Sequence, residues 1–116
     1  MSEEKTIFQK IIQKEIPSIT HYEDDLCIVI EDINPKAPLH LLIIPKKPIS
    51  KLSDASDEDA SILGHLMLIL GEMSRKFETE DSFNVVINNG ASAGQTVFHL
   101  HLHLLAGRDF SDLFPA

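Results

Sequence analysis

The sequence predicts an α+β domain in which a five-stranded, largely antiparallel sheet packs with one short and one long helix. Three observations lead to this class. The apolar pattern follows the order helix, three strands, long helix, two strands. The connections are short and the strands are grouped around the helices, which favours antiparallel pairing. The 116 residues, 43% of them hydrophobic, suffice for a single domain spanning 1–116.

The first half of the chain is predicted to form a short helix and three strands. Thr6 can cap the helix and Pro17 ends it. The helix residues with apolar side chains at helical spacing are Ile7, Phe8, Ile11 and Ile12. The strands that follow are expected at residues 19–23, 26–31 and 39–44. A loop stiffened by two prolines, 32–38, precedes the third strand.

The second half is predicted to contain one long helix and two strands. A linker or single helical turn at 50–56 leads into the helix Asp57–Phe77, whose acidic start and basic end complement the helix dipole. Its apolar arc is broader than one contact with a sheet needs, and a five-stranded sheet has edges that need covering, so a homodimer is expected. Strands are expected at 83–88 and 98–105, joined by a loop of small residues.

Composition limits the partners. The net charge of -8 argues against non-specific binding to duplex nucleic acid, which requires many phosphates to be neutralised. No apolar run approaches the roughly 18 residues of a membrane span, and the polar segment 1–5 lacks the apolar stretch of a secretion signal. A cytoplasmic protein without a membrane partner is therefore expected. Cys27, the only cysteine, lies in an apolar run and is interpreted as a small buried hydrophobe.

The most informative stretch is 99–105, where three of the six histidines alternate with leucines. On a β-strand, His99, His101 and His103 would point to one face and the leucines to the other. Neighbouring histidine rings would then lie about 6–7 Å apart, because the rise is roughly 3.3 Å per residue.

The loop before these histidines offers groups that could bind an anion. Gly90 and Gly94 let main-chain N–H groups turn toward an anion, and Gln95 and Thr96 add side-chain donors. An anion cradle beside imidazoles suits phosphoryl transfer, in which a neutral imidazole can attack phosphorus. Two alternatives stay open from the residues alone. One is a zinc ion held by two histidines with His40 as an extra ligand, although no carboxylate or cysteine lies close in sequence. The other is a purely structural histidine cluster.

The alternation of three histidines with hydrophobic residues resembles the histidine-triad family of nucleotide hydrolases and transferases. The resemblance covers nearly the whole chain and points to the histidine-triad nucleotide-binding (Hint) branch. The segments that carry it are 7–8, 14–17, 23–25, 32–40, 44–47, 64–67, 88–90 and 94–99.

The resemblance implies a role for each residue of the site. His101 would be the nucleophile that attacks the α-phosphorus, His99 and His103 would flank it, and His40 would support the triad from a neighbouring strand. The implied substrate contacts are Asp32 at the ribose, Asn88 at the sugar-phosphate, Gly94, Gln95 and Thr96 in the phosphate loop, and Ile7, Phe8, Ile11 and Ile33 around the base.

The expected activity is hydrolysis of a purine nucleoside phosphoramidate, releasing the nucleoside monophosphate through a nucleotidylated His101. Hydrolysis of dinucleoside polyphosphates and a non-catalytic nucleotide-binding or regulatory module are the alternatives. No metal or cofactor is expected, because the electron pair of His101 must be free and the anion can be held by loop donors, by His103 and by a protonated neighbour. Typical members of the branch have Ser where Thr96 stands, and many have a C-terminal Trp that this chain lacks. The preferred leaving group therefore stays open.

Overall fold

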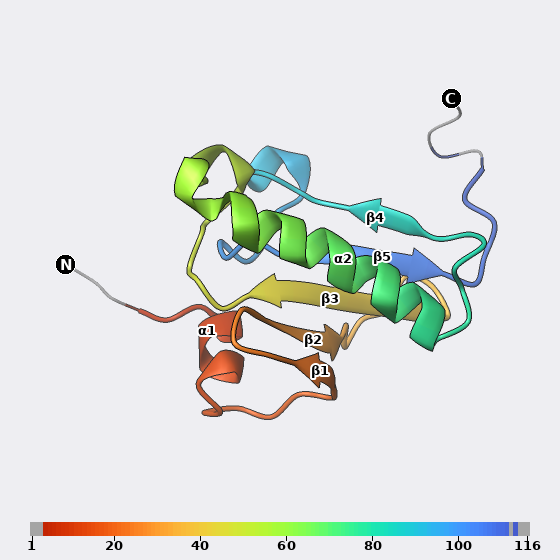
Figure 1. Ribbon diagram of the computed structural model, residues 1–116, viewed down its shortest axis with the longest axis horizontal. Helices are drawn as coiled ribbons and strands as arrows, with labels where there is room; N and C mark the ends of the chain where they lie inside the picture. The colour runs from red at the N-terminus through yellow and green to blue at the C-terminus, as the bar shows by residue number, and fades with distance from the viewer. Residues whose placement is uncertain (1–3, 112, 114–116) are drawn as a thin grey trace.

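The structure is a computed structural model that describes residues 4–111 and 113 (Figure 1). Its helices and strands, in chain order, are α1 (Ile7–Ile12), β1 (Thr20–Glu23), β2 (Cys27–Glu31), β3 (Leu39–Pro45), α2 (Ala60–Lys76), β4 (Asn84–Val86) and β5 (Leu102–Ala106). Short 3-10 turns occur at Leu52–Asp54, Asp57–Asp59 and Ala91–Ala93. The predicted α+β class and the order of its elements are confirmed. In the described part of the chain, every helix is too short or too polar to cross a membrane.

The five strands form one antiparallel sheet in the order β1-β2-β3-β5-β4. The histidine strand β5 therefore lies between β3 and β4. In the register of β3 with β5, Leu42 pairs with His103 and His40 pairs with Leu105. Because side chains two residues apart share a face, this register places His40 and His103 diagonally on one face of the sheet.

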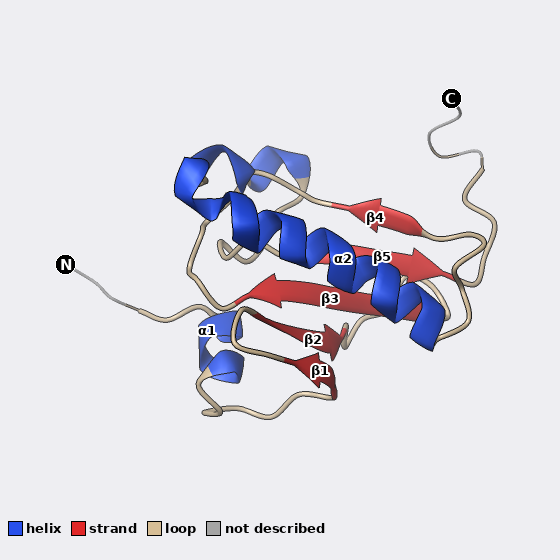
Figure 2. Ribbon diagram, viewed as in Figure 1, coloured by secondary structure: helices blue, strands red, loops and turns tan. Residues whose placement is uncertain are grey.

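The two faces of the sheet are covered by different helices (Figure 2). On one face α2 packs against a core that includes Leu100, Leu102 and Leu104. On the other face α1 contributes Phe8 and Ile11 to a second core, whose strand residues are Ile28, Ile30, Leu42 and Ile44. The prediction that the leucines of the 99–105 stretch enter a core is thus confirmed.

The regular strand predicted at 98–105 is wrong in its first half, because β5 begins only at Leu102. Ile43 is the partner of Leu102, so continuing the ladder would pair Leu100 with Pro45, which has no N–H to donate. The N–H of Leu100 instead donates to the carbonyl of Ile49 at 2.7 Å. His99 and His101 consequently lie on an irregular segment. The ring spacing also differs, since the centroids of His101 and His103 are 5.0 Å apart.

Three other predicted elements are shorter than expected. The first helix, predicted to end at Pro17, ends at Ile12, with Gln13 as its C-cap. The strand predicted at 83–88 is reduced to β4. The helix predicted to begin at Asp57 opens with a 3-10 turn, and α2 proper begins at Ala60. The carboxylate of Asp59 accepts the N–H of Ser56 at 3.0 Å and pairs with Lys47, so this side chain holds the turn that precedes the helix.

Candidate active site

A cavity of about 1090 Å³ brings together six of the residues predicted from the sequence. They come from the loop 32–38, from β3 and β5, and from the segment after β4: Asp32, His40, Asn88, Gly94, Thr96 and His103. The order of strands explains this convergence, because β5 has β3 on one side and β4 on the other.

A chain of hydrogen bonds fixes the protons of His40 and His103. The N–H of Lys36 donates to Nδ1 of His40 at 3.0 Å, so that nitrogen is an acceptor. A neutral His40 then carries its proton on Nε2, which lies 2.9 Å from Nδ1 of His103. His103 must accept at Nδ1 and therefore carries its own proton on Nε2. His103, which lines the cavity, therefore has an N–H donor at Nε2.

His101 has the opposite tautomer. Its Nδ1 lies 2.8 Å from the carbonyl oxygen of His99, which can only accept, so the proton is on Nδ1. The Nε2 atom of the neutral ring thus holds an unprotonated electron pair. The ring packs edge-on against Phe8 at 4.8 Å and against His103 at 5.0 Å between centroids. His101 is 7% exposed and is not among the residues that line the cavity, but its ring lies beside that of His103, which does line it. A neutral imidazole next to an N–H donor is suited to attack on an electrophilic phosphorus.

His99 is the most deeply placed of the three, with 1% of its surface exposed. Its Nε2 donates to the carbonyl oxygen of Pro45 at 2.7 Å, at the end of β3. Its Nδ1 has no hydrogen-bond partner among the described residues. The bond to Pro45 ties the irregular segment to β3 and thereby positions the carbonyl that orients His101.

Burial is the main electrostatic influence on the site. It lowers the pKa of His40, His99, His101 and His103, because a charged imidazolium is poorly solvated there. The pKa of His103 falls to about 4 through burial and the neighbouring His101 and His40. The expectation of a protonated neighbour is therefore wrong for these histidines in the free site. The cations that line the cavity are Lys36 and Arg108.

The glycine loop is organised differently from the prediction. The N–H of Gly90 donates to Oε1 of Gln95 at 2.7 Å, and the N–H of Gly94 donates to Ala91 at 3.0 Å, so both are engaged within the loop. Gln95 is 3% exposed, and its Nε2 donates to the carbonyls of Ser50 and Val97. These bonds indicate that the Gln95 amide holds the loop together rather than contacting a ligand. Thr96 is exposed, and its hydroxyl makes no hydrogen bond within the described residues, so it can donate to a ligand.

Gly94 shapes the wall of the cavity through its backbone. Its φ of +98° is a left-handed conformation that side chains disfavour. A Cβ built there would lie 3.3 Å from Nδ2 of Asn88. That amide in turn donates to the carbonyl of Ala93 at 2.9 Å. A glycine at 94 therefore lets Asn88 brace the loop.

The residues expected around the base do not gather in one place. Phe8 and Ile11 are buried, 6% and 7% exposed, and belong to the core under α1. Ile7 is 46% exposed and Ile33 is 85% exposed, and neither lines the described cavity. Phe8 reaches the site through its contact with His101. The base-binding role of this set stays a prediction.

Asp32, which was predicted to contact the ribose, also lies beside the histidines, although it is not close to the histidine triad in the sequence. Oδ2 of Asp32 lies 3.3 Å from Nε2 of His40, and ligand atoms of Asp32, His40 and His103 lie within 4.8 Å of one another. This set could hold a metal ion, which removes one objection to the zinc alternative. An ion would, however, displace the hydrogen bond between His40 and His103. Asp32 also accepts the N–H of Asn34 at 2.8 Å, which fixes the loop.

Two cationic residues of the cavity were missed in the sequence. Lys36 lines the cavity, its main-chain N–H donates to His40, and its ammonium donates to the carbonyl of Asn34 at 3.0 Å. Arg108 donates to the carbonyl of Lys36 at 3.4 Å and lies 4.7 Å above the ring of Phe110. The net charge of the chain is -8, so its composition gave no sign that two cations would line one cavity. The signal that could have found Lys36 is its position between two prolines in the loop before His40.

Comparisons with known proteins agree with this geometry. A family model described as "HIT domain" matches residues 13–110. An uncharacterized HIT-like protein of Synechocystis is 57% identical over 108 residues, covering 93% of this chain and 95% of its own. A HIT family hydrolase from Clostridium thermocellum superposes with a TM-score of 0.89 at 42% identity, covering 94% of this chain and 96% of its own. A histidine triad nucleotide-binding protein from Candida albicans has a TM-score of 0.79 at 30% identity, with 94% and 90% covered.

Proposed function

This chain belongs to the HIT domain family, and we propose that it hydrolyses purine nucleoside phosphoramidates or related 5′-phosphoryl compounds through a nucleotidyl intermediate on His101. One observation carries the proposal. The 2.8 Å bond from Nδ1 of His101 to the His99 carbonyl leaves Nε2 with a free electron pair at neutral pH. The lowered pKa of His101, caused mainly by burial, favours the same neutral form.

In the first proposed step, Nε2 of His101 attacks the α-phosphorus. A nitrogen–phosphorus bond forms, and the bond to the leaving group breaks with its electron pair passing to the leaving atom, which takes up a proton from solvent. His103 donates from Nε2 to a phosphate oxygen, and Lys36 and Arg108 balance the anionic charge. The neutral histidines supply hydrogen bonds and the two cations supply charge.

In the second proposed step, water attacks phosphorus and the bond to His101 breaks. The electron pair returns to Nε2, a proton from the water passes to solvent, and the nucleoside monophosphate is released. The backbone carbonyl of His99 keeps the ring in one orientation through both steps. A ring that is held in place avoids the entropic cost of reorienting for each step.

We place the protein in the Hint branch, acting on purine nucleotides in the cytoplasm without a metal or cofactor. Support comes from the name of the Candida albicans relative, a histidine triad nucleotide-binding protein, and from the Clostridium relative, described as a hydrolase. Asp32 lines the cavity and can accept ribose hydroxyl bonds through Oδ2. The net charge of -8 makes binding of a nucleic acid duplex unfavourable.

We further propose a homodimer formed by α2 and the edge strand β4. Leu68 and Met67 on α2 are 70% and 51% exposed, and Val85 on β4 is 40% exposed. β4 is an edge of the sheet, so one side of its backbone is free to pair with another chain. A second copy that pairs there would cover both the edge and the apolar residues of α2.

An activity panel tests the proposed function against its alternatives. The panel contains an adenosine phosphoramidate, an acyl-adenylate and dinucleoside polyphosphates, with nucleoside monophosphate as the product measured. We expect the phosphoramidate to be turned over fastest. Preference for a dinucleoside polyphosphate would favour the first alternative. Tight binding of the monophosphate without release of product from any substrate would favour a non-catalytic binding module.

A further inference from the structure

A second cluster of titratable side chains lies apart from the histidine cavity, on the face of the sheet that α2 covers. It consists of Asp24 in the turn after β1, Cys27 at the start of β2 and His65 on α2. One ligand atom from each of the three residues lies within 4.8 Å of the others. None of the three residues lines the cavity that holds His103.

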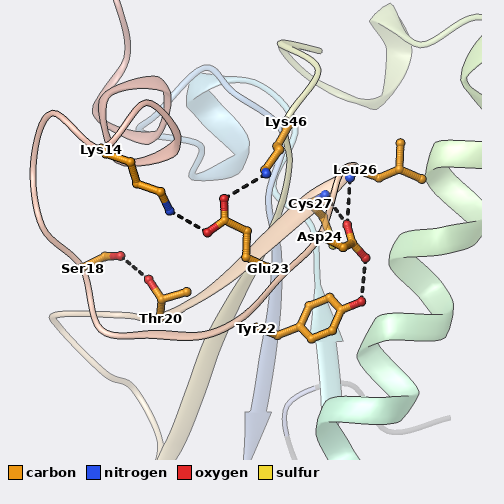
Figure 3. A network of polar contacts seen from close by, with 9 residues as sticks. All are labelled: Lys14, Ser18, Thr20, Tyr22, Glu23, Asp24, Leu26, Cys27 and Lys46. Carbon is orange, nitrogen blue, oxygen red and sulfur yellow. Dashed lines mark hydrogen bonds and ion pairs between the residues drawn. The ribbon is translucent and has the colours of Figure 1, made fainter.

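The carboxylate of Asp24 is held with one oxygen directed at the helix. Its Oδ1 accepts the main-chain N–H groups of Leu26 and Cys27 at 2.8 and 2.9 Å. Its Oδ2 lies 2.7 Å from the Tyr22 hydroxyl and 2.6 Å from Nε2 of His65. Figure 3 shows this carboxylate between Tyr22 and the start of β2, on the side of α2. Oδ2 is therefore the oxygen that faces His65.

The surroundings of the cluster favour a cation. Burial and the negative charge of Asp24 raise the pKa of the Cys27 thiol to about 12, and Glu72 adds to this effect. The hydrogen bond to Asp24 and burial raise the pKa of Tyr22 to about 12. Burial is the larger cause for Cys27 and the hydrogen bond to Asp24 is the larger cause for Tyr22, so these shifts alone do not identify a cation site. The geometric observation is that a carboxylate oxygen, a thiol sulfur and an imidazole nitrogen lie close together, and a bound cation would favour the thiolate.

We propose that Asp24, Cys27 and His65 form a binding site for one zinc ion. Sulfur, imidazole nitrogen and carboxylate oxygen are the ligands that zinc takes, whereas calcium and magnesium require oxygen ligands. Thiolate and carboxylate together carry two negative charges, which the ion neutralises. On binding, Cys27 loses its thiol proton to solvent and a sulfur–zinc bond forms, while His65 coordinates as the neutral ring.

The geometry requires small movements only. Ligand atoms around a tetrahedral zinc ion lie about 3.3–3.7 Å apart, given bond lengths of about 2.0–2.3 Å. His65 and Asp24 would separate slightly from their present 2.6 Å, and the ligand atom of Cys27 already lies within 4.8 Å of both. The side chains of His65 and Asp24 are 28% and 25% exposed, so a water molecule can take the fourth position. The bound ion would fasten the β1–β2 turn to α2 and stabilise the fold.

Cobalt titration of the full, untagged chain tests this site. Because Cys27 is the only cysteine, a thiolate-to-cobalt absorption band can arise only from a metal bound to Cys27. We expect this band together with the visible bands of tetrahedral cobalt, saturating at one equivalent per chain and abolished by stoichiometric zinc. We also expect zinc to raise the Tm of the wild type.

Variants separate this site from the other histidines. Cys27→Ala and His65→Gln should each lose the thiolate band and the rise in Tm with zinc, with circular dichroism confirming that they are folded. His21→Gln, whose ring pairs with Glu31, and His103→Asn should both keep the band. Absence of the band in the wild type, or an undiminished band in folded His65→Gln, overturns the proposal. A band lost in His103→Asn but kept in His65→Gln also overturns it.

Discussion

His40 on β3 and His103 on β5 share a hydrogen bond of 2.9 Å, and the main-chain N–H of Lys36 sets its direction. A proton added to Nδ1 of His103 would face the N–H of His40. Burial, which is the largest cause, and the neighbouring His101 and His40 keep His103 neutral and its pKa at about 4.

The lowered pKa of His103 makes stability depend on pH. In the unfolded chain a histidine binds a proton near pH 6.5, whereas His103 in the folded chain resists it down to about pH 4. The unfolded state therefore binds more protons in this interval, so stability is full above pH 6.5 and is lost as the pH falls toward 4. We expect a decrease of up to about 3 kcal/mol from this group. Urea unfolding at several pH values should give a smaller decrease for His103→Asn than for the wild type; equal decreases would contradict the assignment.

Replacement of His101 with Asn should remove turnover while preserving the fold. Asn has no ring nitrogen to attack phosphorus, so we expect kcat/KM to fall by at least about a thousandfold. Binding of the nucleoside monophosphate should change only a few-fold. In the wild type, acid quench during turnover should trap a protein that is heavier by one nucleotidyl group, attached at His101. His21→Gln, outside the cavity, is the matched control, and a rate for His101→Asn within a few-fold of the wild type would exclude His101 as the nucleophile.

Asp32→Ala should weaken binding of ribose-containing nucleotides. A carboxylate that accepts ribose hydroxyl bonds contributes about 1.5–3 kcal/mol, which corresponds to roughly a 10- to 150-fold loss of affinity. Because Asp32 also lies 3.3 Å from His40, part of any loss comes from the histidines themselves. Comparison with 2′,3′-dideoxy nucleotides separates the two causes. The loss should be clearly larger for the ribose form, and equal losses would argue against a ribose contact.

Leu68→Asp should convert the proposed dimer into a monomer. The side chain is 70% exposed on α2, and a charge buried at an interface without a partner is strongly unfavourable. Light scattering at tens of micromolar should give a dimer mass for the wild type and a monomer mass for the variant. Ile19→Asp, at a 61% exposed position just before β1, the edge strand opposite β4, should remain dimeric. A monomeric wild type at this concentration would refute the interface.

Exhaustive chelation should leave the hydrolytic activity per folded chain unchanged. The proposed attack uses the free electron pair of His101, which a metal at that nitrogen would occupy. The assay is run well below the Tm, so that loss of an ion from the Asp24 cluster does not unfold the protein. If activity is lost and zinc restores it even in Cys27→Ala, an ion at Asp32, His40 and His103 must take part in the reaction.

Local patterns predicted the secondary structure well and the side-chain bonding less well. The alternation of leucine with histidine correctly placed the leucines in the α2 core, because the two faces of the sheet differ in what covers them. The start of β5 was missed because it depends on its partner strand, where Pro45 ends the ladder. Such a boundary follows from register, which is a property of two segments far apart in the sequence.

In the candidate site, too, the sequence predicted which residues take part better than it predicted their contacts. The sequence identified His40, Asn88 and Thr96, and all three line the cavity with His103. It could not show that the amide of Gln95 is used inside the loop, since that depends on bonds to Ser50 and Val97. Nor could it place Lys36 and Arg108 together, because 72 positions separate them and only the packing of the chain joins them.

The bond between His101 and the His99 carbonyl has a consequence for mutational robustness. The group that orients the proposed nucleophile belongs to the main chain, so no substitution of the side chain at position 99 deletes it. Only a change in the path of the backbone can move it. Replacing Leu100 with proline is such a change, because its N–H donates to Ile49 at 2.7 Å. Loss of the His99 side chain is another, because its bond to Pro45 positions this stretch of backbone. The orientation of the His101 ring is therefore sensitive to replacements at the two preceding positions, 99 and 100.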